Sequence, residues 1–330
     1  MEISPYREIF RDIVNGRTFT SLRDQPCYIR HFTSHERVEM RSKYDFYYAE
    51  AKRRGLMTDD ACVKFYEEAG VWGQKEENDI ASKKLYLDSL MRNKKNLALK
   101  SQIDQANKDI EIATREISEL ESQKREIFGT TCETYGMQKA NDHFIASIFF
   151  KDEEFKERII QPEKVDDIDP DFYNLLIFTN NEFMDKFSEE AIQHLCLEDF
   201  YYIYYPYCED AVNFFGQPIV KLTDNQLQLI SYTRIFKNIF ERYDKIPESI
   251  RKDPKAVLDY GSISEEAREK MQQNVDREGG TATTLMGATK EDFEYVGLTE
   301  GEDKVVHLHE EAAKKGGSLS MDDLMKLSGH

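Results

Sequence analysis

The longest regular pattern of apolar and polar positions lies at residues 74–128. This stretch contains no glycine or proline and is dense in lysine, glutamate, glutamine and aspartate. Isoleucine recurs every seven residues, at Ile103, Ile110 and Ile117. A second series fills the complementary heptad positions, at Ala106, Ala113, Leu120 and Ile127. Together the two series have the alternating four- and three-residue spacing of a coiled-coil seam, so the pattern predicts a long helical arm.

The seam changes phase inside the arm. Leu87, Leu90 and Leu97 keep the same spacing but are out of register with the later series. The arm is therefore either one helix with a stutter, about 80 Å long at 1.5 Å per residue, or a helical hairpin that folds back at Arg92–Asn96. We favour the hairpin, because an alanine-rich seam needs a close partner and an intramolecular one is always present.

The residues before the arm carry shorter patterns. Ser4 followed by Pro5 is a helix start, and Gly16 is a stop signal. Residues 18–33 mix β-formers with turn residues and predict a short hairpin or an extended segment. A helix is predicted from Ser34 to Arg54, with Val38 on the same stripe as two tyrosines.

Two regions of different texture follow the arm. The first is rich in aromatic residues and carries a helix start at Ser188 and a capping box at Thr223 and Gln226. The second, from Asp244 onward, holds many of the glycines and only short helix starts. We expect the second region to be a flexible tail of short recognition helices, since no part of it could bury a core of its own.

These patterns predict a mainly α protein. We expect a helical-bundle core, a protruding coiled-coil arm (hairpin or long helix) and an extended C-terminal tail. The predicted regions are an N-terminal helical part of the core, the arm, an aromatic-rich helical core and the tail, at residues 1–73, 74–128, 129–243 and 244–330. The candidate partner-binding residues are the arm's Ile103, Ile110, Ile117, Leu120 and Ile127, and the tail's Met321, Leu324, Met325 and Leu327. The tail residues form an apolar stripe suited to a groove on a partner.

The net charge and the lack of long apolar stretches exclude two classes of partner. The chain has 45 Lys and Arg against 63 Asp and Glu, a net charge of -18. A phosphate-backbone binder needs a cationic surface, so we expect no nucleic-acid partner. No stretch approaches the roughly 18 apolar residues of a membrane-spanning helix, and the first residues lack a signal peptide's layout. The sequence therefore predicts a soluble, cytosolic protein with no membrane partner.

The aromatic cluster between Phe200 and Phe215 could stack on single-stranded nucleic acid, but such platforms carry Arg and Lys beside the rings. The charged residues from Leu197 to Gly216 are all acidic. Core packing, with some tyrosine hydroxyls at an interface, is the favoured interpretation.

Cysteine and histidine spacing gives little support for metal chemistry. The five cysteines contain no CxxC pair and are expected to be reduced, small apolar residues. His31 and His35 would share a helix face if that segment is helical, and His307 and His309 would share one side of a strand. Neither pair has an obvious third ligand, so we expect no metal and no cofactor.

Catalytic motifs are also missing from the sequence. It has no P-loop, no GxGxxG after a strand, no GxSxG, no HExxH and no EF-hand loop. A non-enzymatic protein is expected. A metal-dependent enzyme that uses one of the two histidine pairs is the alternative from a different class.

Three fragments carry a family resemblance. They are EAKRRGL…EEAGVWGQKEE at Glu50–Glu77, DPKAVLDY at Asp253–Tyr260, and the tail pair GATKEDFEYVGL and SMDDLMKLSG at Gly287–Leu298 and Ser320–Gly329. The general character of their sequences resembles that of structural and tail-assembly proteins of tailed bacteriophages, including tail assembly chaperones and baseplate-hub assembly factors. No functional residue transfers position by position.

The resemblance implies a non-enzymatic protein that joins or escorts other virion proteins, such as the tape measure or the tail tube. It places the chain in the host cytoplasm during assembly, with residence in the virion as an open alternative. A permanent neck or baseplate component is the competing role within this class. The sequence also leaves open a homo-oligomer.

Overall fold

The protein is mainly helical, as predicted. In the computed structural model, the residues that the structure describes are 4–97, 99–243, 246–263 and 292. Two compact units divide the chain, and we call them unit 1 and unit 2. Unit 1 is Met1–Asn78, Glu121–Arg242 and Lys252–Pro254, and unit 2 is Asp79–Leu120, Tyr243–Arg251 and Lys255–His330. The division runs through the predicted arm, whose two ends belong to unit 1.

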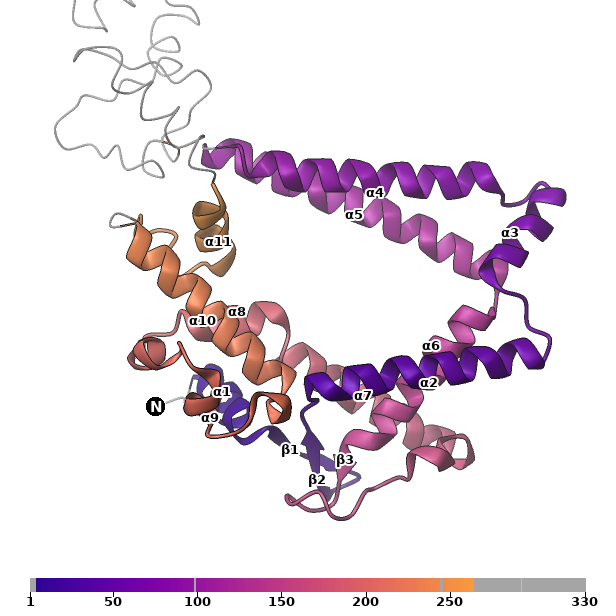
Figure 1. The fold of residues 1–330 in the computed structure, drawn as a ribbon, viewed down its shortest axis with the longest axis horizontal. Helices are drawn as coiled ribbons and strands as arrows, with labels where there is room; N and C mark the ends of the chain where they lie inside the picture. Colours follow the sequence, from indigo (N-terminus) through magenta and orange to yellow (C-terminus); the bar gives the residue numbers. More distant parts are fainter. Residues whose placement is uncertain (1–3, 98, 244–245, 264–291, 293–330) are drawn as a thin grey trace, which may run out of the picture. The chain divides into compact units, whose positions relative to one another are not determined.

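Unit 1 holds most of the helices and the small sheet (Figure 1). Its first elements are α1 (Pro5–Asn15), β1 (Arg17–Leu22), β2 (Gln25–Arg30), α2 (Ser34–Arg53) and α3 (Asp59–Glu68). After the arm come α6 (Cys132–Ile148), β3 (Phe149–Phe150), η1 (Pro162–Asp167), α7 (Pro170–Lys186) and α8 (Glu189–Cys196). The last are η2 (Tyr202–Tyr207), α9 (Ala211–Phe215), η3 (Ile219–Lys221) and α10 (Asp224–Arg242). Unit 2 takes most of its described residues from α4 (Gln74–Lys94), α5 (Lys100–Phe128) and α11 (Pro254–Ser262).

Several helix boundaries follow from capping residues. Helix α1 begins at Pro5 and ends at Gly16, whose φ of 64° is the left-handed conformation that glycine adopts without strain. The predicted capping box before α10 is present, since the Thr223 N–H donates to Gln226 Oε1 at 2.9 Å and Thr223 Oγ1 accepts from the Gln226 N–H. The Ser188 side chain caps α8 by accepting a hydrogen bond from the Ala191 N–H. Local sequence therefore places these ends correctly.

The segment before α2 forms a β-hairpin, the first of the two predicted alternatives. Strands β1 and β2 pair antiparallel, and β2 pairs with β3 in the order β1-β2-β3. The hairpin turn is Arg23–Asp24, both with positive φ, which matches the right-handed twist of the strands. Strand β1 is thereby left at an edge of the sheet.

Helices α2 and α6 lie side by side in unit 1 (Figure 1). They approach closely because Gly136 has no side chain: a Cβ there would lie 3.2 Å from the Tyr48 backbone nitrogen and 3.2 Å from Tyr44 Cε2. Ala140, one turn further along α6, is fully buried. Val38, on the predicted stripe of α2 with Tyr44 and Tyr48, is 66% exposed. A rigid backbone contact at Gly136 thus sets the spacing of the two helices.

The aromatic cluster packs into unit 1 in part. Tyr201 is fully buried, and its hydroxyl lies 3.0 Å from Thr233 Oγ1 on α10. Tyr205 donates to the Cys196 carbonyl oxygen at 2.9 Å. Ile203 and Tyr207 point to solvent, because the 3₁₀ turn η2 buries only one of its sides.

Replacing Gly136 by leucine tests the close contact. The larger side chain must push α2 away at the Tyr48 backbone, so we expect unit 1 to lose about 1–3 kcal/mol of stability. Denaturant unfolding followed by the fluorescence of Trp72, the only tryptophan and a unit 1 residue, measures the loss. Met137→Leu at an exposed position of the same helix is the control and should leave stability unchanged. Equal stability of both variants would show that the spacing is not fixed at Gly136.

Candidate functional site

The arm is a helical hairpin. Helix α4 ends at Lys94, α5 begins at Lys100, and the two run back alongside each other (Figure 1). In unit 2, Lys83 Nζ on α4 lies 2.7 Å from Glu116 Oε2 on α5, which sets the antiparallel register. Leu97 falls beyond the end of α4, so the phase change in the seam marks the turn. The preferred hairpin prediction is confirmed.

The predicted seam faces inward. Ile103 and Ile117 are buried, as is Ala113 between them, while Ile110, Leu120 and Ile127 are partly covered. On α4, Ile80 is buried and Leu87 and Leu90 are partly covered at the matching heptad spacing. Partner binding through the seam stays a prediction, since in this conformation its residues are covered by the chain itself.

A second set of apolar side chains lies on the outside of the hairpin. Leu85 is 70% exposed and its neighbour Tyr86 is 55% exposed, and Met91 and Ile112 are also open to solvent. The heptad pattern does not identify these residues, because they fall outside the seam. An apolar residue that interrupts an otherwise polar outer face is the signal that could have identified them.

A pocket of about 440 Å³ lies in unit 2 where α4 ends, beside α5 and α11. It is lined by Met91, Lys94, Lys95, Asn107, Ile110, Glu111, Lys255 and Ser262. Lysines outnumber acids in this lining, although the chain as a whole is acidic. Lys94 is paired with Asp259, so Lys95 and Lys255 are the ammonium groups of this lining that could attract a carboxylate beside its apolar wall.

A polar cluster joins the three helices beside the pocket. Lys94 of α4 forms an ion pair with Asp259 of α11, and both side chains are largely buried. The same carboxylate accepts from Asn107 Nδ2 of α5 at 3.1 Å. Each partner is satisfied by another, so the cluster fixes α11 against the hairpin within unit 2.

Asp292 caps the start of α5. Its Oδ1 accepts from the Ser101 backbone N–H at 2.7 Å, and its Oδ2 accepts from Ser101 Oγ at 2.8 Å. The Asp292 side chain is fully buried, and a carboxylate is favoured at the positive end of a helix. The sequence patterns did not predict this contact, because Ser101 and Asp292 are far apart in the chain.

The tail candidates lie outside the described residues. This applies to Met321, Leu324, Met325 and Leu327, and to the histidine pair His307 and His309.

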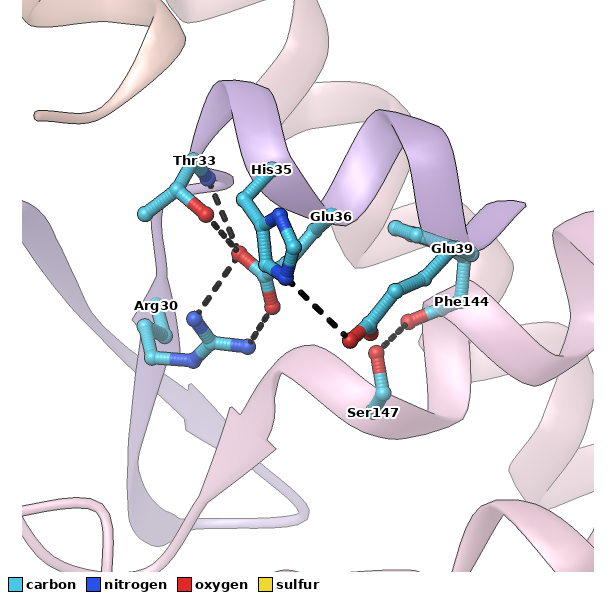
Figure 2. Close-up of polar contacts among 7 residues, drawn as sticks. All are labelled: Arg30, Thr33, His35, Glu36, Glu39, Phe144 and Ser147. Atoms are coloured by element: carbon cyan, nitrogen blue, oxygen red, sulfur yellow. Dashed lines mark hydrogen bonds and ion pairs between the residues drawn. The ribbon is translucent and has the colours of Figure 1, made fainter. Parts of the chain in front are cut away.

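His31 and His35 do not share a helix face. His31 follows β2, and α2 begins only at Ser34. The buried His31 ring has Thr18 Oγ1 at 2.9 Å from Nε2 and Asn225 Nδ2 at 3.2 Å from Nδ1, so both of its nitrogens already have partners. His35 is exposed and faces Glu39 on α2 (Figure 2). The geometric premise of this metal-ligand pair is therefore wrong.

Glu36, next to His35, serves the fold. It accepts from the Thr33 N–H at 2.9 Å and forms an ion pair with Arg30 (Figure 2). Burial by itself would raise the pKa of Glu36, but the hydrogen bonds from Arg30 and Thr33 hold it below its usual value. The charge thus anchors the start of α2 to β2.

The cysteines are free and buried, as expected. Burial raises the pKa of Cys27 to about 11 and that of Cys196 to about 12, so both thiols stay protonated near neutral pH. Among the described residues, no three His, Cys, Asp or Glu side chains converge as metal ligands. In the same part of the chain, no helix combines the length and apolar character needed to cross a membrane.

Comparison of the chain with protein-family models, with curated proteins and with solved structures finds no match. The resemblance to tail-assembly proteins therefore stays a prediction.

His31 predicts a pH dependence of stability. Burial lowers its pKa from 6.5 to about 3, so the unfolded chain binds a proton between these values and the folded chain does not. The contribution of His31 to the free energy of unfolding is therefore largest above pH 6.5 and is lost as the pH falls toward 3. We expect the free energy of unfolding to fall by about 2 kcal/mol between pH 7 and pH 5.

Denaturant unfolding followed by Trp72 fluorescence at pH 7, 6 and 5 measures this slope. His31→Gln should be less stable at pH 7 but show a flatter slope. His143, whose pKa is also lowered, first by burial, is present in both proteins and cancels in the comparison. Identical slopes in the two proteins would contradict a neutral, buried His31.

Asp259→Ala tests the polar cluster in unit 2. The change leaves the largely buried Lys94 ammonium and the Asn107 amide without their acceptor, at a cost of about 2 kcal/mol. Amide hydrogen exchange in α11 should therefore accelerate by about 30-fold. Glu111→Ala, at an exposed pocket position, is the matched control. Unchanged exchange in Asp259→Ala would show that α11 is held by other contacts.

Proposed function

We propose that the chain is a non-enzymatic assembly protein of a tailed bacteriophage that binds other structural proteins through helical faces and its C-terminal segment. The observation that carries this proposal is the pair of adjacent exposed apolar residues on the hairpin, Leu85 and Tyr86. The resemblance of the sequence fragments to tail-assembly proteins supplies the class of partner.

The hairpin holds this pair in a fixed orientation. Leu87 and Leu90 are partly covered on the same helix, and the Lys83–Glu116 ion pair links α4 to α5 in unit 2. Leu85 and Tyr86 consequently point outward while the leucines of the seam stay packed. Tyrosine is enriched at the energetic centres of protein interfaces, because it buries a large ring and keeps a polar end.

Charge supports an escorting role. The net charge of -18 keeps the chain soluble and favours the solubility of an apolar partner bound to it. The lysine-lined pocket of unit 2 adds a local attraction for acidic residues of such a partner. Apolar contact would then supply affinity, and charge would supply orientation.

Co-purification from infected host cells tests the proposal. Leu85→Asp and Tyr86→Asp should each reduce recovery of the bound structural protein at least tenfold, because each buries a carboxylate in the interface. Gln102→Glu, at an exposed position of α5 near the turn of the hairpin, adds the same charge away from this face and should retain the partner. Recovery that is equal in all three variants would exclude this face of the hairpin.

Two further arms of the experiment separate the roles within the class. Removal of residues 262–330 tests the tail, which contributes nothing if every partner is retained. Mass spectrometry of purified mature particles distinguishes a chaperone, which is absent, from a permanent neck or baseplate component, which is present at fixed stoichiometry. A chain that captures no virion protein under any of these conditions would overturn the proposal.

A further inference from the structure

Strand β1 offers an unpaired edge. In the order β1-β2-β3 it has a neighbour on one side only, at the left of the sheet in Figure 1. The register pairs Leu22 with Gln25 and Thr18 with Ile29, and the His31 N–H donates to the Gly16 carbonyl oxygen at 3.0 Å. Antiparallel strands bond their neighbour at alternate residues. Residues 16, 18, 20 and 22 therefore face β2.

The intervening residues, Arg17, Phe19 and Ser21, direct their backbone N–H and C=O groups away from β2. Pro26, which lies opposite Ser21 and has no N–H, agrees with this alternation. Within the described part of the chain, no protein group is bonded to the outward backbone of these three residues. Such an edge is a template for an added strand.

The side chains on the outer face of β1 are also uncovered. Phe19 is 61% exposed although it is the largest side chain of the strand, and its ring meets Tyr28 edge-on, with centroids 5.5 Å apart. Thr18 and Leu22, on the opposite face, are buried and hold the strand in place. An exposed phenylalanine on an open edge marks a contact surface rather than a protected edge.

Local charge permits a second copy of the chain as the occupant of this edge. The chain carries -18 overall, but β1 (RTFTSL) contains no acidic residue. The arginines at its two ends are balanced, since Arg17 pairs with Glu153 at 3.0 Å and Arg23 with Asp169 at 3.2 Å. Two copies can therefore approach at this edge without the repulsion that opposes contact elsewhere on an acidic surface.

We propose that β1 pairs antiparallel with β1 of a second copy of this chain, with Phe19 opposite Phe19 across a two-fold axis. In this register the three outward residues of each strand form the hydrogen-bonded pairs, Phe19 with Phe19 and Arg17 with Ser21. All the outward backbone groups of both strands are then satisfied, and the two phenylalanine rings cover each other on one face. The inference does not depend on the assembly role proposed above.

The pairing is self-complementary, as a two-fold interface requires. A single strand pair is small beside the roughly 1,200–2,000 Å² of stable complexes, so we expect a reversible dimer with a dissociation constant of roughly 1–100 µM.

Light scattering coupled to size exclusion tests the dimer on the full chain. The mass should rise with concentration toward twice the 38.7 kDa of one chain. Ser21→Pro removes one outward N–H from each strand and should raise the dissociation constant about tenfold, while Ser21→Ala keeps the N–H and should dimerise normally. A chain that is monomeric at 200 µM, or a dimer that Ser21→Pro does not weaken, would overturn the proposal.

A cross-linking experiment covers the case in which Ser21→Pro fails to fold. Opposed residues of a hydrogen-bonded pair have Cα atoms about 5.5 Å apart, within reach of a disulfide. Phe19→Cys should form a covalent dimer under mild oxidation. Ser21→Cys should not, because its own copy lies about 13 Å away along the strand. The five native cysteines are buried and serve as the background. Equal cross-linking at both positions, or none at Phe19→Cys, contradicts the register.

Discussion

The closure of the apolar seam between α4 and α5 is the interaction on which the functional argument depends. Exposing a heptad series of isoleucine and alanine to water along a whole helix costs free energy. Here the chain covers the series with its own second helix. Because the seam is used internally, its residues orient the hairpin. The apolar residues that remain outside, above all Leu85 and Tyr86, are the ones available to another protein.

Polar residues in the interior of unit 1 serve the fold in the same way. The Asp12 carboxylate is buried and lies 2.8 Å from Lys186 Nζ, and the Gln226 amide donates to the carbonyl oxygens of Ile13 and Val14 at the end of α1. His31 is held between Thr18 and Asn225. A buried polar group costs free energy unless it is paired, and each of these groups has found a partner. They join elements that are distant in the sequence.

The surfaces of the protein combine two properties that suit an assembly role. The general surface is acidic and resists association, whereas a few places, the outer face of the hairpin, the lysine-lined pocket and the edge of β1, depart from it. Long-range repulsion suppresses unspecific contacts, so that binding is confined to sites where apolar area or local positive charge overcomes it. Hairpin and strand edge are also rigid elements, which reduces the entropy lost on binding.

Local sequence determined the helical class, the hairpin, the helix starts at Pro5 and Thr223, and the reduced state of the cysteines, because each depends on neighbours within a few residues or on composition. Only the tertiary structure decided the rest. The Asp292 carboxylate reaches Ser101, and Gly136 admits the backbone of α2. On α2, the structure brings Tyr44 and Tyr48 against Gly136 and leaves Val38 exposed. Periodicity defines the faces of a helix, but which face is covered depends on contacts between segments far apart in the chain, and these leave no periodic signal in the sequence.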